Sequence, residues 1–245
     1  MQENKIISIP FFIPALVISL GLILASSVGA YAFYKSRTLD NTLSVTGSTK
    51  TRVVSDSAKW TFNIYRRVYE QSIPTGYSSL AKDLAQVNAF LNQNGIKENQ
   101  ITVNPIYMEE VWREPSYQGP REVILRQVIM VDSEDVKGIT AVAKSTETLA
   151  RSGILISTQS PQYFYSKLSE LRVSLLSDAI KDAKSRAEQI AKSSGQSIGS
   201  LKSASSGVVQ VLAPNSIEVT DYGTYDTSTI DKDVMVTVRG VFFVK

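Results

Sequence analysis

The chemistry open to this chain is limited by two residue types that it lacks. The 245-residue sequence contains no histidine and no cysteine. A thiol nucleophile, a disulfide, a Ser-His-Asp triad and an imidazole metal ligand are therefore excluded. We expect a protein that is not an enzyme and that needs no cofactor. The alternative that stays open is an enzyme that works with carboxylates, serine, lysine or tyrosine alone.

Three glutamates could form a pair of catalytic carboxylates. Glu109, Glu110 and Glu114 lie close together in the sequence, and a general acid and its partner in a glycosidase are both carboxylates. The sequence shows no partner across a cleft, and proline and glycine follow within the same segment. A solvated hairpin tip is the better interpretation of these residues.

A second acidic group lies near the C-terminus, in a polar segment from residue 214 to residue 233. Carboxylate oxygens are the ligands that calcium needs. The spacing of these acids lacks the alternation and the glycine of an EF-hand loop, so the sequence favours a solvated loop and no metal site. The residues are Glu218, Asp221, Asp226, Asp231 and Asp233.

Aromatic residues are the candidates for contact with a partner. Trp112 and Tyr117 lie in a polar, proline-bearing loop, where aromatic side chains make good contact anchors. Phe242 and Phe243 belong to an expected terminal strand, 234–244, that is apolar on both faces. A strand of this kind needs cover on both sides, from a second subunit or from its own domain. Both alternatives stay open for the loop and for the strand.

The N-terminal segment is typical of a membrane anchor. No charged residue occurs from Ile6 to Tyr34, which is more than the roughly 20 apolar residues that a bilayer-spanning helix needs. We expect residues 1–35 to form the anchor, with residues 6–34 in the lipid bilayer, followed by a linker over 36–41. The alternative is a secretory signal peptide cleaved near Ala30 or Ala32.

The remaining chain, 42–245, mixes the periodicities of strands and helices. Alternating apolar residues predict half-buried strands, with Trp60 and Phe62 in the core, and steps of three and four predict helices that end at glycines. The class is α+β, with two βαβ-like halves that suggest an internal pseudo-repeat. Expected strands cover 43–47, 58–68, 100–108, 123–131, 154–157, 201–211 and 234–244; expected helices cover 77–95, 133–153 and 168–195.

Three stretches of the sequence resemble the SIMPL domain family, also called DUF541, of bacterial envelope proteins. They are the opening strand 43–47 with Asp56-Ser57-Ala58, the helix end and strand 91–102, and the alanine-rich helix 179–199 with its glycine exit. The resemblance covers about residues 42–245. It implies a mixed α+β fold, an exported or membrane-anchored location and large symmetric assemblies in some members. It implies no catalytic residue.

We therefore expect a single-pass protein of the bacterial inner membrane, with its C-terminal domain in the periplasm or outside the cell. The basic residues are scattered, so the sequence predicts no nucleic-acid partner. The expected activity is homo-oligomeric assembly or binding of a protein partner. A soluble periplasmic binding protein, formed after signal cleavage, is a further alternative.

Overall fold

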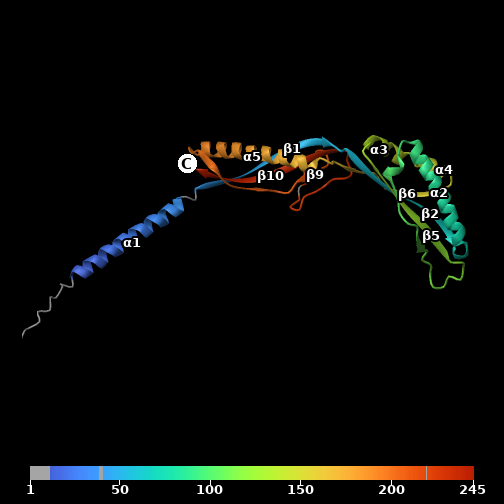
Figure 1. The fold of residues 1–245 in the computed structure, drawn as a ribbon, viewed down its shortest axis with the longest axis horizontal. Coiled ribbons are helices and arrows are strands. Elements are labelled where there is room, and N and C mark those ends of the chain that lie inside the picture. The colour runs from blue at the N-terminus through green and yellow to red at the C-terminus, as the bar shows by residue number, and fades with distance from the viewer. Residues whose placement is uncertain (1–11, 39–40, 219) are drawn as a thin grey trace, which may run out of the picture. The chain divides into compact units, whose positions relative to one another are not determined.

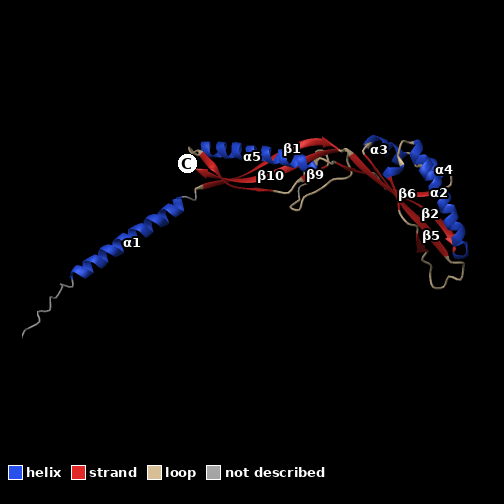
Figure 2. Cartoon of the chain, in the orientation of Figure 1, coloured by secondary structure: helices blue, strands red, loops and turns tan. Residues whose placement is uncertain are grey.

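The computed structural model describes residues 12–38, 41–218 and 220–245, and it confirms the α+β class. The helices and strands form two antiparallel sheets with packed helices and one apolar N-terminal helix (Figures 1 and 2). Contacts divide the chain into two compact units. One unit comprises residues 1–47, 183–205 and 239–245, and the other comprises residues 48–182 and 206–238.

Helix α1 (Phe12–Thr38) is the predicted apolar segment. It extends three residues into the expected linker, because Ser36, Arg37 and Thr38 continue the helix. The remaining part of the linker at 39–40, and the start of the expected lipid-facing segment at 6–11, lie outside the described residues.

The first sheet has the strand order β1 (Thr42–Val54), β10 (Asp231–Val244) and β8 (Ile198–Ser206), and the short β9 (Gln210–Leu212) also pairs with β10. Helix α5 (Leu168–Ser193) lies along this sheet (Figure 1). Its Leu175 packs in a core cluster with Val211, Val234 and Val236. The stripe of the helix then continues as Ala179, Ala183, Ala187 and Ala191, which are all buried, whereas Ile190, three residues after Ala187, is exposed.

The second sheet is built on a long antiparallel pair, β2 (Ser57–Tyr69) and β5 (Glu122–Ser133), in register from Ala58 opposite Ser133 to Tyr69 opposite Glu122. The strand order is β3-β5-β2-β6, with β4 beside β5 and β7 beside β2. The bounds of the shorter strands are β3 (Ile101–Val103), β4 (Tyr107–Glu110), β6 (Leu155–Thr158) and β7 (Gln162–Phe164).

The core of this second sheet confirms the predicted place of Trp60 and Phe62. Both side chains are almost fully buried, and their rings stack with centroids 4.2 Å apart. Helix α2 (Ile73–Gln93) adds Leu80, Val87 and Leu91 to the same core. The other elements are α3 (Val136–Lys144), α4 (Glu147–Arg151) and the 3₁₀ turns η1 (Glu70–Ser72) and η2 (Glu98–Gln100).

Three predicted elements are interrupted in the structure. The strand expected over 100–108 is divided into β3 and β4 at Pro105, which has no N–H for a strand ladder. The helix expected over 133–153 is divided into α3 and α4 at Ser145. The strand expected over 201–211 is two strands, β8 and β9, and between them Gly207 N donates to Thr237 O at 2.9 Å.

Candidate functional site

The β4–β5 hairpin holds the two aromatic residues of the predicted contact loop. Strands β4 and β5 pair from Tyr107 opposite Arg126 to Glu110 opposite Val123. Val111 N then donates to Glu122 O at 3.1 Å, which closes the base of the loop 111–121. The loop therefore projects from a regular hairpin, as the sequence predicted.

Trp112 and Tyr117 differ in how firmly the loop holds them. The Arg113 guanidinium lies 5.2 Å from the Tyr117 ring centroid and forms an ion pair with Glu122. A Cβ at Gly119 would lie 2.2 Å from the Tyr117 hydroxyl oxygen, so any other residue there would displace this ring from its present position. Trp112, in contrast, is 80% exposed. Tyr117 packs on its own loop, and Trp112 is the side chain that is available to a partner.

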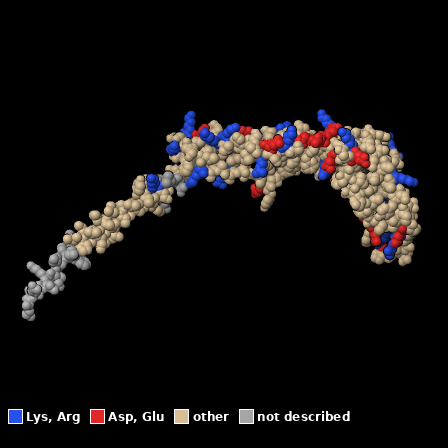
Figure 3. Space-filling model, in the orientation of Figure 1, with Lys and Arg blue, Asp and Glu red and all other residues tan. Residues whose placement is uncertain are grey.

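A hollow of about 470 Å³ lies beside the hairpin loop. Its lining combines apolar and charged side chains, among them Glu70, Ile73, Met108, Trp112 and Tyr117. Acidic and basic side chains gather at this end of the hairpin (Figure 3). An exposed tryptophan beside a hollow with a polar rim has the composition of a protein contact site.

The three glutamates of the hairpin are exposed, as predicted. The Arg126 guanidinium lies 3.3 Å from a carboxylate oxygen of Glu109, which makes a surface ion pair. Such pairs contribute about 0–1 kcal/mol to stability. The geometry of Glu109, Glu110 and Glu114 is that of a solvated strand end and turn.

Comparison with protein-family models decides the family. The model described as "SIMPL: Protein of unknown function (DUF541)" matches residues 43–242, which is most of the chain. The chain belongs to the SIMPL family. The match confirms the predicted family, and it spans the three stretches in which the sequence resembles SIMPL domains.

Other comparisons add little to the SIMPL assignment. No curated protein matches the chain. One similar solved structure is described as an amidase of the hydantoinase/carbamoylase family from Burkholderia phymatum, with 10% sequence identity and a TM-score of 0.27. The match covers 51% of this chain and 34% of the amidase, so the chain spans about a third of that protein. A score this low carries no argument about the SIMPL domain.

Asp226 of the SIMPL domain corrects the prediction of a wholly solvated acidic loop. Its carboxylate accepts hydrogen bonds from the backbone N–H groups of Ser228 and Thr229 and from both hydroxyls. Lys232, with no exposed surface, donates to Thr229 O at 2.8 Å and lies 3.4 Å from Asp226 Oδ2. Asp226 and Lys232 therefore tie the loop before β10 to the start of that strand.

The pKa values of these two groups follow from their surroundings. Burial raises the pKa of Asp226, but the hydrogen bonds from Ser228 and Thr229 outweigh it and lower the pKa well below its usual range. Burial also lowers the pKa of Lys232, against the opposing effect of the Asp226 charge. Asp226 stays ionised and supports the buried ammonium group.

Asp233 also differs from the predicted solvated loop, because its side chain is only 2% exposed. It accepts from Arg52 Nε at 2.9 Å, from Lys50 Nζ at 3.1 Å and from Asn215 N at 3.2 Å. The hydrogen bond from Arg52 is the largest cause of a pKa that lies well below the usual range. Asp233 ties β10 to β1 and to the loop after β9.

The other acids of this segment stay on or near the surface. Glu218 and Asp221 are exposed, and so is Asp231. In the part of the chain that the structure describes, no group of three or more acidic side chains is placed to hold a metal ion. The five acids predicted as one cluster thus divide into the buried Asp233, the partly buried Asp226 and three exposed residues.

The terminal strand places its two phenylalanines differently. Phe242 is 3% exposed, and its face of β10 also carries the buried Val234, Val236 and Val238. This face is covered within the chain, so a surface contact through Phe242 does not agree with the structure. Phe243 is partly exposed, with Lys202 Nζ 5.7 Å from its ring centroid. Its role in contact with another subunit stays a prediction.

Sequence reasoning missed a buried ion pair in the SIMPL domain. Asp83 of α2 is 3% exposed and accepts two hydrogen bonds from Arg66 of β2, at 2.6 and 2.7 Å. The signal was present in the sequence, because Arg66 continues the alternation of Trp60, Phe62 and Ile64. A charged residue in the phase of buried residues needs a buried partner.

Proposed function

We propose that this SIMPL protein is a membrane-anchored envelope protein that acts by assembly or by binding a protein partner, without catalysis. The observation that carries the proposal is an apolar helix long enough to span a bilayer, joined to a SIMPL domain. Residues 13–36 meet the length and composition of a membrane span. A signal sequence near an N-terminus meets the same criteria, so retention of the helix is part of the proposal.

Helix α1 has the surface of a lipid-embedded segment. Its large apolar side chains from Ile13 to Tyr34 are more than half exposed, between 53% and 69%. Figure 3 shows basic side chains only at the C-terminal end of the helix. The Ser19 and Ser27 hydroxyls donate to Leu16 O and Ile23 O within the helix, so these polar groups need no water.

The contact with a partner is assigned to the hairpin loop around Trp112. A tryptophan held away from its own domain gains most when a partner buries it, and tryptophan is enriched among residues that dominate interfaces. Tyr117 and Met108 lie beside it on the lining of the hollow and extend the apolar area.

Membrane fractionation tests the anchor. The full chain should stay in the membrane pellet after carbonate and urea washing, with an intact N-terminus by mass spectrometry. A soluble mature chain that begins near Ala30 or Ala32 would contradict the anchor and favour a soluble periplasmic protein.

The contact is tested by comparing Trp112→Ala with Tyr222→Ala, an exposed aromatic in a different loop. Trp112→Ala should weaken self-association or partner capture by about 2 kcal/mol, roughly 30-fold in affinity. Tyr222→Ala should leave it unchanged. Equal effects of the two variants would remove the hairpin from the proposal.

A further inference from the structure

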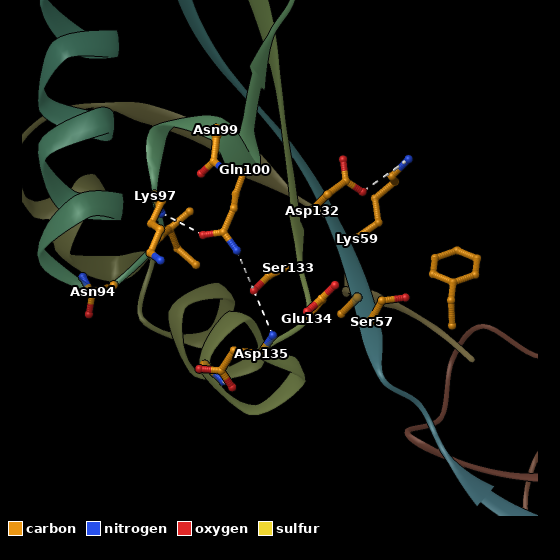
Figure 4. Close-up of a pocket in the computed structure, with 15 residues that line it drawn as sticks. Ser57, Lys59, Asn94, Lys97, Asn99, Gln100, Asp132, Ser133, Glu134 and Asp135 are labelled. Atoms are coloured by element: carbon orange, nitrogen blue, oxygen red, sulfur yellow. Dashed lines mark hydrogen bonds and ion pairs between the residues drawn. The ribbon is translucent and has the colours of Figure 1, made fainter. Parts of the chain in front are cut away.

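A cleft of about 780 Å³ lies where four segments of the second sheet and its helices meet (Figure 4). The segments are the start of β2, the turn 94–100 that follows α2, residues 132–135 from the end of β5 to the start of α3, and Phe164 of β7. Small-molecule sites have volumes of about 300–1,000 Å³, and this cleft falls in that range. Its lining includes Asn94, Lys97, Asn99, Gln100, Ser133 and Phe164.

A chain of hydrogen bonds fixes the groups at the floor of this cleft. Lys97 N donates to Gln100 Oε1 at 2.8 Å. A backbone N–H can only donate, so this bond sets the orientation of the Gln100 amide and turns Nε2 toward Ser133 Oγ, at 3.2 Å. Asp135 N donates to the same Ser133 oxygen at 3.0 Å. These bonds are visible in Figure 4.

Ser133 is therefore left with one unused hydrogen-bond donor. Its hydroxyl oxygen accepts two bonds, and among the described residues no acceptor is placed for its own proton. The residue is only 6% exposed, and buried polar groups in proteins are normally paired. The floor of the cleft thus presents an O–H donor to whatever enters it.

Most charges around the cleft already have partners. Lys59 and Asp132 form an ion pair at 3.5 Å, and the Asp135 carboxylate accepts from Gly138 N at 2.9 Å at the start of α3. The Asn94 amide nitrogen donates to Phe90 O at 2.8 Å, which leaves its amide oxygen for a ligand. The other two charged side chains of the lining, Lys97 and Glu134, have opposite signs, so neither sign of charge prevails. The amide and hydroxyl groups then suit a neutral polar ligand.

The backbone of the cleft excludes recognition of a peptide by strand addition. Ala58 of β2 pairs with Ser133 of β5 on one side and with Tyr163 of β7 on the other. A ligand must therefore be recognised by side chains. Ala58, Ile96 and the partly exposed Phe164 add an apolar part to the lining.

We propose that this cleft binds a neutral oligosaccharide. Sugar hydroxyls both donate and accept, so they match the Ser133 donor and the amide oxygens of Asn94 and Asn99. The C–H face of a sugar ring matches the apolar area at Phe164. This binding activity is independent of assembly through the hairpin and goes beyond it.

The test is saturation-transfer NMR on the full chain in a detergent without a sugar head group. The probes are maltotriose and tri-N-acetylchitotriose, with trialanine as the peptide comparison. At least one trisaccharide should receive saturation from the protein. The signal should fall at least fivefold in Asn99→Ala and in Ser133→Ala, and should persist in Asn92→Ala, an exposed asparagine outside the cleft.

Exposed Asn99 keeps the test decisive if Ser133→Ala disturbs folding, because Asn99→Ala removes no buried bond. The absence of saturation for both sugars would overturn the proposal. A sugar signal that is equal in Asn99→Ala and Asn92→Ala would also overturn it, and so would binding of trialanine in place of the sugars.

Discussion

At the scale of single residues, the three buried charged side chains in the described part of the chain, Asp83, Lys232 and Asp233, each have a partner of opposite charge. Asp83 is held by both nitrogen donors of the Arg66 fork, and Asp233 by two cations and a backbone N–H. Lys232 is enclosed by carbonyl and carboxylate oxygens. Burial of a charge is costly unless it is paired and hydrogen-bonded, so loss of one partner should be felt strongly.

The first prediction concerns Asp83. Asp83→Asn should lower the free energy of unfolding by about 2–3 kcal/mol, because it leaves the Arg66 guanidinium without its carboxylate. Chemical denaturation followed by circular dichroism measures this change. The control is Glu147→Gln, which removes an ion pair with Arg151 whose side chains are 70% and 79% exposed. It should change stability by less than about 0.5 kcal/mol. Equal losses in both variants would contradict this account.

The second prediction is the pH dependence of Asp233. Its pKa is lower in the folded chain than in the unfolded chain, mainly because Arg52 donates to the ionised form. Its contribution to stability is therefore complete above the unfolded value of about 3.9 and is lost as the pH falls through the lower folded value.

Asp233→Asn should accordingly cost about 1–2 kcal/mol at pH 7, since both cations are about half exposed and partly screened. The cost should shrink as the pH is lowered below 4. Denaturation curves at neutral and acid pH measure both values, with exposed Asp221→Asn as the control. A cost that is the same at both pH values would show that the carboxylate charge is not its source.

At the scale of secondary-structure elements, periodicity and glycine predicted most of the architecture. Gly95, Gly153 and Gly195 were expected to end helices, and all three have positive φ, at 85°, 81° and 74°. Such a conformation favours glycine after a helix. The apolar stripe of α2 and the hairpin that pairs β3 and β4 with β5 follow from residue spacing, whereas the long β2–β5 pairing joins strands far apart in the sequence and was not predicted.

The breaks within predicted strands and helices, and the residue that caps α3, were harder to predict because they depend on single hydrogen bonds. The helix expected from Ser133 begins at Val136, and its N-cap is Asp135, whose side chain accepts from Gly138 N. The Ser133 hydroxyl oxygen accepts a hydrogen bond from Asp135 N, just before the helix begins. Both serine and aspartate are good caps, and only the path of the chain out of β5 decides between them.

The third prediction follows from this cap. Asp135→Ala should destabilise the protein by about 1 kcal/mol, because the first turn of α3 loses its acceptor. Thermal or chemical unfolding measures the change. Glu134→Ala, at an exposed neighbour, should have an effect below about 0.5 kcal/mol. A larger effect at Glu134 than at Asp135 would mean that the cap is assigned to the wrong residue.

The candidate sites could be predicted from sequence only in part. Residue type and a polar loop were enough to identify Trp112 as a contact candidate, and its exposure agrees. The 780 Å³ cleft joins residues near 58, 99, 133 and 164, and no local pattern links segments so far apart. Asp226 and Asp233 were predicted to lie in a solvated loop, because the sequence alone does not reveal which cationic side chains pair with them in the fold.

At the scale of the whole molecule, an apolar N-terminal helix precedes a SIMPL domain that covers most of the chain. A tether confines copies of the domain to one surface and raises their local concentration, which favours weak contacts between them. Closed cyclic symmetry would let every copy use the same contact. The exposed hairpin and the partly exposed face of β10 are the surfaces available for this purpose.

The most direct test of this account is the native mass of the full chain extracted in detergent. Assembly on a retained anchor predicts a complex whose mass is an integral multiple of the intact 26.9 kDa chain. Trp112→Ala should shift the population toward the single chain, whereas Tyr222→Ala should not. The claim that the protein acts by assembly or partner binding would be contradicted by a wild-type protein that captures no partner and stays a single chain. The concentration for this test is tens of micromolar, on the order of weak interface affinities.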